Sequence, residues 1–299
     1  MTRLTRAFVT THWLREQISK ASSHRESHIK ILEAAWKPNI TNSGYEDVYV
    51  KDRIPEALDF DLHRCVSSTP LIPRSIPEIP CFTDYVRQLG IRHDSHVIVY
   101  DAVNRWPSVR SWWTFRLLGH DNVSILDGGL NKWKKDGYCT TTKAPELKEG
   151  FVPSDWEVYF QEDLIRTMSD VMSNLFTKRE QLVDARREEK FTGAEWDEGI
   201  APGHIPGAVN VPYLSLFNED FTFKSSIELE RIFREAGVDL DRPIVSMCRT
   251  GVTACGLAVA AHILGVDRVP IYNGSWWEWG QIADKKLQVT GREESSRFA

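Results

Sequence analysis

The chain has 299 residues, with 37 Lys and Arg against 42 Asp and Glu, a formal net charge of −5 at pH 7. This length favours two domains, because a domain commonly has roughly 100–200 residues. Hydrophobic residues make up 41% and charged residues 26% of the chain, which excludes a disordered or low-complexity protein. The acidic balance argues against a nucleic-acid partner, and no apolar stretch approaches the roughly 18 residues of a membrane span.

Strands and helices alternate in the first half of the chain. In order, we expect a strand over 29–35, an Ile-Pro turn at 54–55, a helix over 82–89, a strand over 96–101, a helix from about Ser108 and a short strand before Gly128. Gly90 follows the first helix, at the position where glycine takes a left-handed conformation without strain. Such alternation is typical of βαβ units, in which helices cover both faces of a parallel sheet.

The second half repeats this order. Residues 264–274 match residues 118–128 at a constant offset of 146 (264 minus 118), and Trp279 matches Trp133 at the same offset. The corresponding elements are a strand over 181–186, an Ile-Pro turn at 205–206, a helix over 229–236 closed by Gly237, a strand over 243–248, a helix from about Gly251 and a short strand before Gly274. A repeat of this length predicts two tandem α/β domains, each a parallel sheet flanked by helices.

The composition also indicates where the domains begin and end. We place a first domain at 1–140, a linker at 141–162, a second domain at 163–290 and a tail at 291–299. The linker is rich in Thr, Lys, Pro and Glu with little apolar periodicity, and the tail has the composition of a disordered end. Each domain is then long enough to bury a core of its own.

The cysteines form an odd set of five without a Cys-x2-Cys pair: Cys65, Cys81, Cys139, Cys248 and Cys255. Such a set fits neither a disulfide framework nor a zinc site, so we expect free thiols in a reducing compartment. Cys65, Cys81 and Cys139 belong to no motif and are expected to be inert. No secretory leader is recognisable, and the Thr- and Arg-rich start only faintly resembles a mitochondrial address. The predicted location is therefore cytoplasmic or mitochondrial.

Cys248 is the candidate catalytic residue. It ends a predicted strand, and open parallel sheets bind ligands where strands end and loops lead into helix N-termini. Gly251 permits a tight loop, and the N–H groups at the start of the next helix would stabilise a thiolate. A cysteine at the end of a buried strand is more often a packed apolar residue. Here the loop, the adjacent Arg249, and Asp101 at the equivalent position of the first repeat favour a nucleophile.

Residues 248–255, Cys-Arg-Thr-Gly-Val-Thr-Ala-Cys, closely resemble the active-site loop of the two-domain rhodanese family of sulfurtransferases. Similar segments lie at 8–14, 183–186, 202–208 and 273–276. The resemblance implies two tandem rhodanese-like domains, an inactive first and a catalytic second, with a cleft between them. It also implies substrate contacts from the loop residues Arg249, Thr250, Gly251, Val252 and Thr253.

In the mechanism that this resemblance implies, Cys248 attacks the outer sulfur of a small anionic donor. Sulfite or pyruvate leaves, and the cysteine is left as a persulfide in the loop. Cyanide, or a thiol such as thioredoxin or glutathione, then removes the sulfur. No metal or organic cofactor is implied, and neither nucleic acid nor a membrane is expected as a partner.

The loop sequence bears on the choice of donor. Thiosulfate-using members carry Cys-Arg-Lys-Gly-Val-Thr and mercaptopyruvate-using members carry Cys-Gly-Ser-Gly-Val-Thr, so Arg249 matches the first group while the hydroxyl of Thr250 is nearer the second. The second group also holds the substrate carboxylate with two arginines, and the first of these aligns with Lys190, a point charge rather than a fork. Its first-domain Asp and His fall near His63 and Arg74, which are not the matching types. We favour thiosulfate, with 3-mercaptopyruvate as the alternative.

Other residues carry weaker expectations. Trp36 and Trp106 match family positions that line the cleft, although core packing would explain them equally well. Asp184 and Arg186 are expected to form a structural ion pair rather than to contact substrate, and Cys255 to be a buried apolar thiol. Three tryptophans of the last predicted helix are expected mostly in the core and at an interface: Trp276, Trp277 and Trp279.

Two other classes of function compete with sulfur transfer. A phosphatase of related fold uses Cys-x5-Arg to clamp phosphate, but position 254 is Ala and the loop is one residue too short. A non-enzymatic sulfide-binding or interaction module would be expected if the nucleophile were absent, whereas Cys248 is present. Both alternatives are therefore disfavoured.

Overall fold

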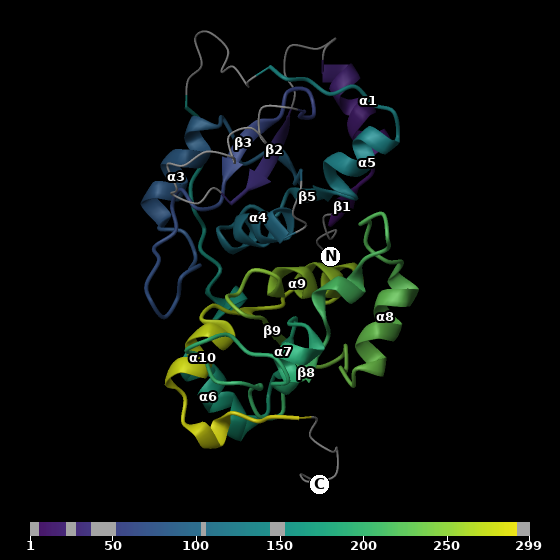
Figure 1. The fold of residues 1–299 in the computed structure, drawn as a ribbon. Coiled ribbons are helices and arrows are strands. Elements are labelled where there is room, and N and C mark those ends of the chain that lie inside the picture. The colour runs from purple at the N-terminus through teal and green to yellow at the C-terminus, as the bar shows by residue number, and fades with distance from the viewer. Residues whose placement is uncertain (1–5, 22–27, 37–51, 103–105, 144–152, 292–299) are drawn as a thin grey trace. The chain divides into compact units, whose positions relative to one another are not determined.

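The computed structural model describes residues 6–21, 28–36, 52–102, 106–143 and 153–291 (Figure 1). The chain divides into two compact units, each completed by a short segment from elsewhere in the sequence. Unit 1 consists of Met1–Val66, Pro77–Gln161 and Asn218–Phe223, and unit 2 of Ser67–Ile76, Glu162–Phe217 and Lys224–Ala299. The middle of the predicted linker, 144–152, and nearly all of the predicted tail lie outside the described residues.

Unit 1 contains a five-stranded parallel sheet in the order β1-β5-β4-β2-β3. Its strands are β1 (Phe8–Val9), β2 (Ile29–Ala35), β3 (Leu58–Asp61), β4 (His96–Tyr100) and β5 (Val123–Leu126). Its helices are α1 (Thr11–Ala21), α3 (Ile79–Gln88), α4 (Trp106–Leu117) and α5 (Gly129–Lys135). The central register places Ile31 of β2 opposite Ile98 of β4. The central strand β4 is buried from Val97 to Tyr100 and is a nearly continuous apolar run, as expected for a strand that is covered on both faces.

Unit 2 has the same topology, in the order β6-β10-β9-β7-β8 and again parallel throughout. Its strands are β6 (Ile165–Arg166), β7 (Gln181–Asp184), β8 (Val209–Asn210), β9 (Ile244–Met247) and β10 (Ile271–Tyr272). Its α-helices are α6 (Met168–Thr177), α7 (Glu188–Thr192), α8 (Ser226–Glu235), α9 (Ala254–Ile263) and α10 (Ser275–Ile282). Single 3-10 turns lie at Glu162–Leu164, Tyr213–Leu216 and Lys285–Leu287. The predicted fold, two tandem α/β units with parallel sheets, is confirmed.

Equivalent tryptophans close one face of each sheet. Trp133 of α5 belongs to the core of unit 1, and Trp279 of α10 to the core of unit 2. The indole N–H of Trp133 donates to the carbonyl of Cys139 at 3.0 Å, and that of Trp279 to the carbonyl of Leu287 at 2.9 Å. The repeat recognised in the sequence therefore extends to the packing, because each buried indole keeps a hydrogen-bond partner.

The residues before unit 2 pack on unit 1. Trp156 is completely buried, with its ring 5.9 Å from that of Phe82. Its indole N–H donates to Nδ1 of His120 at 3.4 Å, while Nε2 of His120 contacts the carbonyl of Ser95 at 3.0 Å. This part of the predicted linker is thus anchored to Phe82 by an apolar contact and to His120 by a hydrogen bond. The exact domain boundaries stay a prediction.

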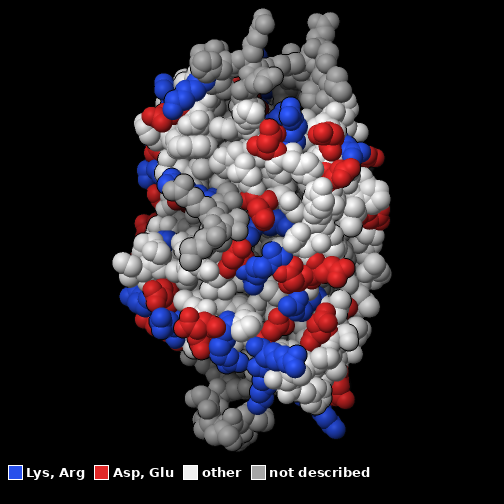
Figure 2. Space-filling model, turned by 180° about the vertical axis from the view of Figure 1, so that it is seen from behind, with Lys and Arg blue, Asp and Glu red and all other residues white. Residues whose placement is uncertain are grey.

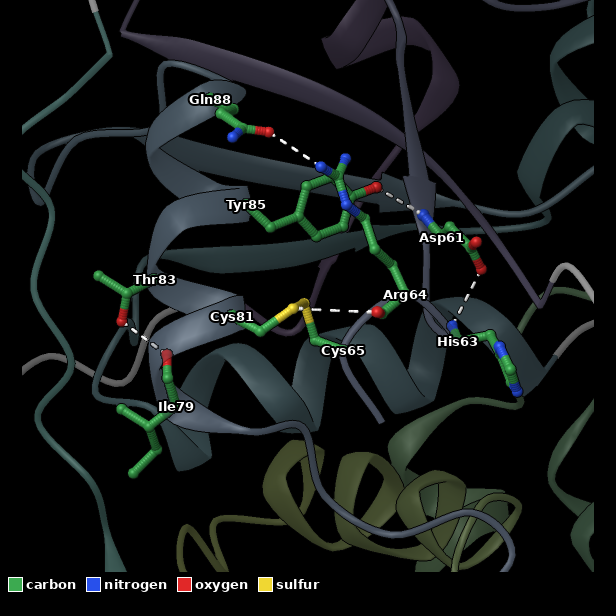
Figure 3. The surroundings of a disulfide bond; sticks show 9 residues. All are labelled: Asp61, His63, Arg64, Cys65, Ile79, Cys81, Thr83, Tyr85 and Gln88. Atoms are coloured by element: carbon green, nitrogen blue, oxygen red, sulfur yellow. Dashed lines mark hydrogen bonds between the residues drawn. A yellow bond between two sulfur atoms is a disulfide. The ribbon is translucent and has the colours of Figure 1, made fainter. Parts of the chain in front are cut away.

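Cys65 and Cys81 form a disulfide, which corrects the expectation that all five cysteines are free thiols (Figure 3). The two residues are separated by 16 positions in the sequence. The backbone N–H of Glu78 donates to the carbonyl of Cys65, and this hydrogen bond brings the residues just before Cys81 close to Cys65. The Cα atoms are 5.6 Å apart, a distance that a disulfide spans. This pairing removes the cysteine-based argument for a reducing compartment. The free cysteines of the described residues are Cys139, Cys248 and Cys255.

Candidate functional site

The candidate site lies where the strand order of unit 2 reverses. The chain continues from β7 to β8 on one side of the sheet and from β9 to β10 on the other. In open parallel sheets, such a switch point at the carboxyl ends of the strands is where ligands bind. Cys248 directly follows β9 there and is only 2% exposed. The structure therefore places the sulfur at the end of the central strand, as the sequence predicts.

The loop after Cys248 depends on Gly251. Its φ of +74° is a left-handed conformation, which residues with a Cβ adopt only with strain. A Cβ added at Gly251 would also lie 3.1 Å from the carbonyl oxygen of Asn273. Thr250 and Val252 on either side are buried, Thr253 is half-buried, and α9 begins at the next residue. The loop is thus a compact turn that leads from strand to helix.

Ser275 holds the backbone of Cys248 and is a residue that sequence reasoning did not single out. Its Oγ accepts from the backbone N–H of Cys248 at 3.2 Å and donates to the carbonyl of Tyr272 at 2.8 Å. The next backbone N–H, of Trp276, donates to the carbonyl of Cys248 at 3.0 Å. Ser275 is fully buried and has a left-handed φ of +52°. The start of α10 therefore fixes both polar backbone groups of Cys248.

Arg249 presents a cation beside the sulfur-bearing residue. Its guanidinium lies 4.5 Å over the ring of Trp277, and its carbonyl accepts from the backbone N–H of Trp277 at 2.8 Å. The arginine Nε donates to Oδ2 of Asp197 at 2.9 Å. Because the arginine side chain is 47% exposed, an anion arriving from solvent can reach it. Trp277 therefore supports this cation while it packs against the edge of the core, and Trp276 and Trp279 are core residues as expected.

Lys190, the other predicted substrate-binding cation, meets the same carboxylate. Its Nζ lies 3.1 Å from Oδ1 of Asp197 and 3.5 Å from Oε1 of Glu195. Burial pushes the pKa of Asp197 upward, but hydrogen bonds from Arg249 and Lys190 outweigh burial and hold that pKa below its usual value. The structure thus brings the two predicted cations together on opposite oxygens of one carboxylate, which the sequence did not reveal.

The predicted structural ion pair is confirmed. Nη2 of Arg186 lies 2.6 Å from Oδ2 of Asp184, and both side chains are buried. The guanidinium also donates to the carbonyl of Gly203 at 2.8 Å and lies 4.5 Å over the ring of Trp276. These contacts tie the end of β7 to α10 and engage the arginine in structural interactions.

The remaining predicted residues are placed as follows. Trp36 and Trp106, both in unit 1, have ring centroids 6.0 Å apart, and whether they line a ligand site stays a prediction. Cys255 is fully buried and outside any disulfide, as expected for a buried thiol, and its Sγ lies 3.5 Å from the carbonyl oxygen of Gly251. Among the residues that the structure describes, no group of three His, Cys, Asp or Glu side chains is arranged to hold a metal ion.

Both halves of the chain match one family. The rhodanese-like domain is matched twice, at residues 22–136 and 167–282. The chain belongs to the rhodanese family. Its two rhodanese-like domains share one strand order, but the position that holds Cys248 in the second holds Asp101 in the first. In the first domain, Asp101 caps the start of α4. Its Oδ2 accepts from the backbone N–H of Ser108 at 3.2 Å and from the hydroxyl of Ser108 at 2.6 Å.

Named relatives cover nearly the whole chain. Thiosulfate sulfurtransferase of Rattus norvegicus is 37% identical over 292 residues, covering 96% of each chain. The 3-mercaptopyruvate sulfurtransferase of the same species is 35% identical over 283 residues, covering 93% of each. A solved structure described as SseA from Escherichia coli, a 3-mercaptopyruvate sulfotransferase, has a TM-score of 0.78 at 34% identity and covers 91% of this chain and 99% of its own. The predicted class of enzyme, a rhodanese-family sulfurtransferase, is confirmed. The names of these relatives include both thiosulfate and 3-mercaptopyruvate as sulfur donors.

Proposed function

We propose that this chain transfers the sulfane sulfur of thiosulfate, through a persulfide on Cys248, to cyanide or to a thiol acceptor such as thioredoxin or glutathione. One observation carries the proposal: Cys248 ends the central strand at the switch point of unit 2, and the exposed guanidinium of Arg249 follows it directly. A cysteine fixed in a loop that leads into a helix has the setting of a nucleophilic thiolate. The partners proposed here are small molecules or thiols.

The reaction is a double displacement at sulfur. In the first step the Cys248 thiolate attacks the outer sulfur of thiosulfate, a new sulfur–sulfur bond forms, and sulfite leaves with the electron pair of the broken bond. In the second step cyanide attacks the outer sulfur of the persulfide, thiocyanate forms, and the cysteine thiolate returns. Each step has one nucleophile and one leaving group, so no external oxidant or reductant is needed.

Arg249 and Lys190 would bind the anionic part of the donor. The guanidinium offers several N–H donors in a planar fork, which suits the oxygens of a sulfonate-like group. Lys190 supplies a point charge and is 18% exposed. These two cations favour a doubly charged donor. A mercaptopyruvate carboxylate would have one bidentate partner here, because of the two cations only Arg249 carries a fork-shaped guanidinium.

Steady-state kinetics test the proposal. We expect thiocyanate to form from thiosulfate and cyanide with ping-pong kinetics, and the Cys248→Ser variant to lose this activity by at least about a thousandfold, because oxygen cannot replace the sulfur nucleophile. Cys139→Ser is the matched control, since it removes an exposed free thiol outside the site and should retain activity. Activity of Cys248→Ser equal to that of wild type would refute the proposed nucleophile.

The choice of donor has its own test. Thiosulfate and 3-mercaptopyruvate are compared side by side, with cyanide and with a dithiol as acceptors. We expect the larger kcat/KM with thiosulfate. A preference for mercaptopyruvate of about tenfold or more, equal to about 1.4 kcal/mol in the barrier, would show that the donor is assigned wrongly.

The compartment is proposed as the cytoplasm or the mitochondrion. Within the described part of the chain, no helix is long and apolar enough to cross a membrane. The N-terminal segment that faintly resembles a mitochondrial address begins outside the described residues. Fractionation of cells that express the full chain would locate it, and recovery in a secreted fraction would contradict the proposal.

A further inference from the structure

The two cations of the proposed donor site belong to one charged cluster in unit 2. Arg249 and Lys190 contact opposite oxygens of Asp197, at 2.9 and 3.1 Å. Lys190 also lies 3.5 Å from Glu195, which in turn lies 2.8 Å from Arg187. Three positive and two negative side chains leave this cluster with a net charge of +1. Asp197 is the carboxylate that links Arg249 to the rest.

The position of Asp197 makes it a competitor for the donor. Its oxygens occupy hydrogen-bonding positions on Arg249 and Lys190 that the oxygens of an anionic donor would also use. Its side chain is 30% exposed, so solvent and a small anion can approach the same place. Hydrogen bonds from both cations hold the pKa of Asp197 below its usual value despite burial, which keeps the carboxylate charged at neutral pH.

We propose that Asp197 is a specificity-determining residue of this enzyme, whose charge disfavours a doubly charged sulfur donor relative to a singly charged one. The inference rests on the proposed donor site at Cys248. A fixed negative charge repels a dianion twice as strongly as a monoanion at the same distance, because the Coulomb energy is proportional to the product of the charges. Asp197 therefore reduces the advantage that Arg249 and Lys190 give to thiosulfate.

Asparagine at position 197 separates charge from geometry. The amide oxygen of Asn can still accept a hydrogen bond from Nε of Arg249, so the cation keeps its place over the ring of Trp277. The substitution removes the negative charge, and the amide NH2 that replaces the other oxygen can no longer accept from Nζ of Lys190. Asp197→Glu keeps the charge and serves as the conservative variant that should restore the wild-type preference.

Kinetics with both donors test this inference. In Asp197→Asn we expect the KM for thiosulfate to fall by about tenfold and that for mercaptopyruvate by about threefold, with kcat changed by less than about twofold, and both effects to shrink at high salt. Glu230→Gln is a matched control, because it removes one carboxylate of unit 2 that pairs with Arg234 on α8. It should leave the ratio of the two KM values unchanged. A thiosulfate KM that is unchanged or raised in Asp197→Asn, or equal shifts for both donors, would overturn the inference.

A binding measurement separates this inference from the proposed reaction. Sulfate, an unreactive dianion, and acetate, a monoanion, are titrated for protection of Cys248 against alkylation by iodoacetamide, followed on the Cys248 peptide by mass spectrometry. We expect Asp197→Asn to lower the half-protecting sulfate concentration by about tenfold and that of acetate by less. This result supports the role of Asp197 even if thiosulfate proves not to donate sulfur. Absence of protection by sulfate in both proteins, or an equal change for both anions, would refute it.

Discussion

Ser275 shows how a single hydroxyl can position the nucleophile. It is buried, it has a left-handed φ of +52°, and its Oγ connects the N–H of Cys248 to the carbonyl of Tyr272. A non-glycine residue in this conformation costs of order 1 kcal/mol and persists only where its surroundings hold it. The hydrogen bonds to Cys248 and Tyr272 are the contacts that hold it here.

Removing this hydroxyl should affect both stability and activity. In Ser275→Ala we expect the free energy of unfolding to fall by about 1–3 kcal/mol, because two buried backbone groups lose a partner. We expect kcat/KM for thiosulfate to fall by about tenfold or more, since the Cys248 backbone is then less firmly placed. Ser275→Gly relieves the left-handed strain but lacks the hydroxyl as well. If Ser275→Gly kept full activity, the positioning role of the hydroxyl would be wrong.

At the level of elements, the sequence predicts the inner strands of each sheet, including the short strands β5 and β10, and misses the edge strands. The segments that become β2, β4, β7 and β9 are short and mainly apolar, so they are recognisable by pattern alone. β1, β6 and β8 have two residues each, and their existence depends on pairing with strands distant in sequence. β3 was missed as well, because its alternation of apolar and acidic residues follows a polar loop.

The residues of the candidate site also divide into those that the sequence predicts and those that it does not. Cys248 and Gly251 follow from a strand, a tight loop and a helix that are contiguous in sequence. Ser275 and Asp197 contact this loop from segments that are distant in sequence, so their roles follow only from the folded chain. The disulfide was missed for the same reason, since a spacing of 16 residues carries no signature of pairing.

The segment before unit 2 makes the stability of unit 1 depend on pH. Burial lowers the pKa of His120 to about 4, and the indole N–H of Trp156 occupies its Nδ1, so a second proton on the ring would break that contact. The unfolded chain binds a proton on this histidine below about pH 6.5, whereas the folded chain does so only below about pH 4. The stability contributed by neutral His120 is therefore complete above about pH 6.5 and is lost as pH falls toward 4.

A histidine variant tests this dependence. We expect His120→Gln to remove up to about 3 kcal/mol of the acid destabilisation between pH 6.5 and 4, measured by urea unfolding at several pH values. Asp127 acts in the opposite direction, because burial raises its pKa to about 6 and stability then rises as its carboxylate is protonated. The comparison is therefore made between variant and wild type at each pH. Parallel pH profiles for the two proteins would contradict the account.

At the level of the whole molecule, one disulfide closes a loop that both units share. Cys65 and Cys81 belong to unit 1, whereas the segment Ser67–Ile76 between them belongs to unit 2. Within unit 2, the carbonyl of Pro70 accepts from the indole N–H of Trp277 at 2.9 Å. On the face drawn in Figure 2, basic and acidic residues are interspersed. This distribution agrees with an enzyme whose anion site is local and small.

The disulfide leads to a prediction about stability. Closing a loop of this length restricts the unfolded chain, and we expect the Cys65→Ser variant to be less stable than the oxidised wild type by about 3 kcal/mol. Thiol titration of the unfolded, unreduced chain should find three free cysteines. A reductant should lower the unfolding midpoint of the wild type and leave that of the variant unchanged. Five titratable thiols before reduction would refute the pairing.

The mass of the protein after exposure to thiosulfate tests the central claim most directly. Intact-mass spectrometry of the wild type, followed by mapping of the Cys248 peptide, should show a gain of one sulfur atom, about 32 Da, that cyanide removes. Cys248→Ser should show no gain, and Cys255→Ser should gain the same mass as the wild type. An unchanged wild-type mass, or a persulfide that maps to a cysteine other than Cys248, would contradict the account.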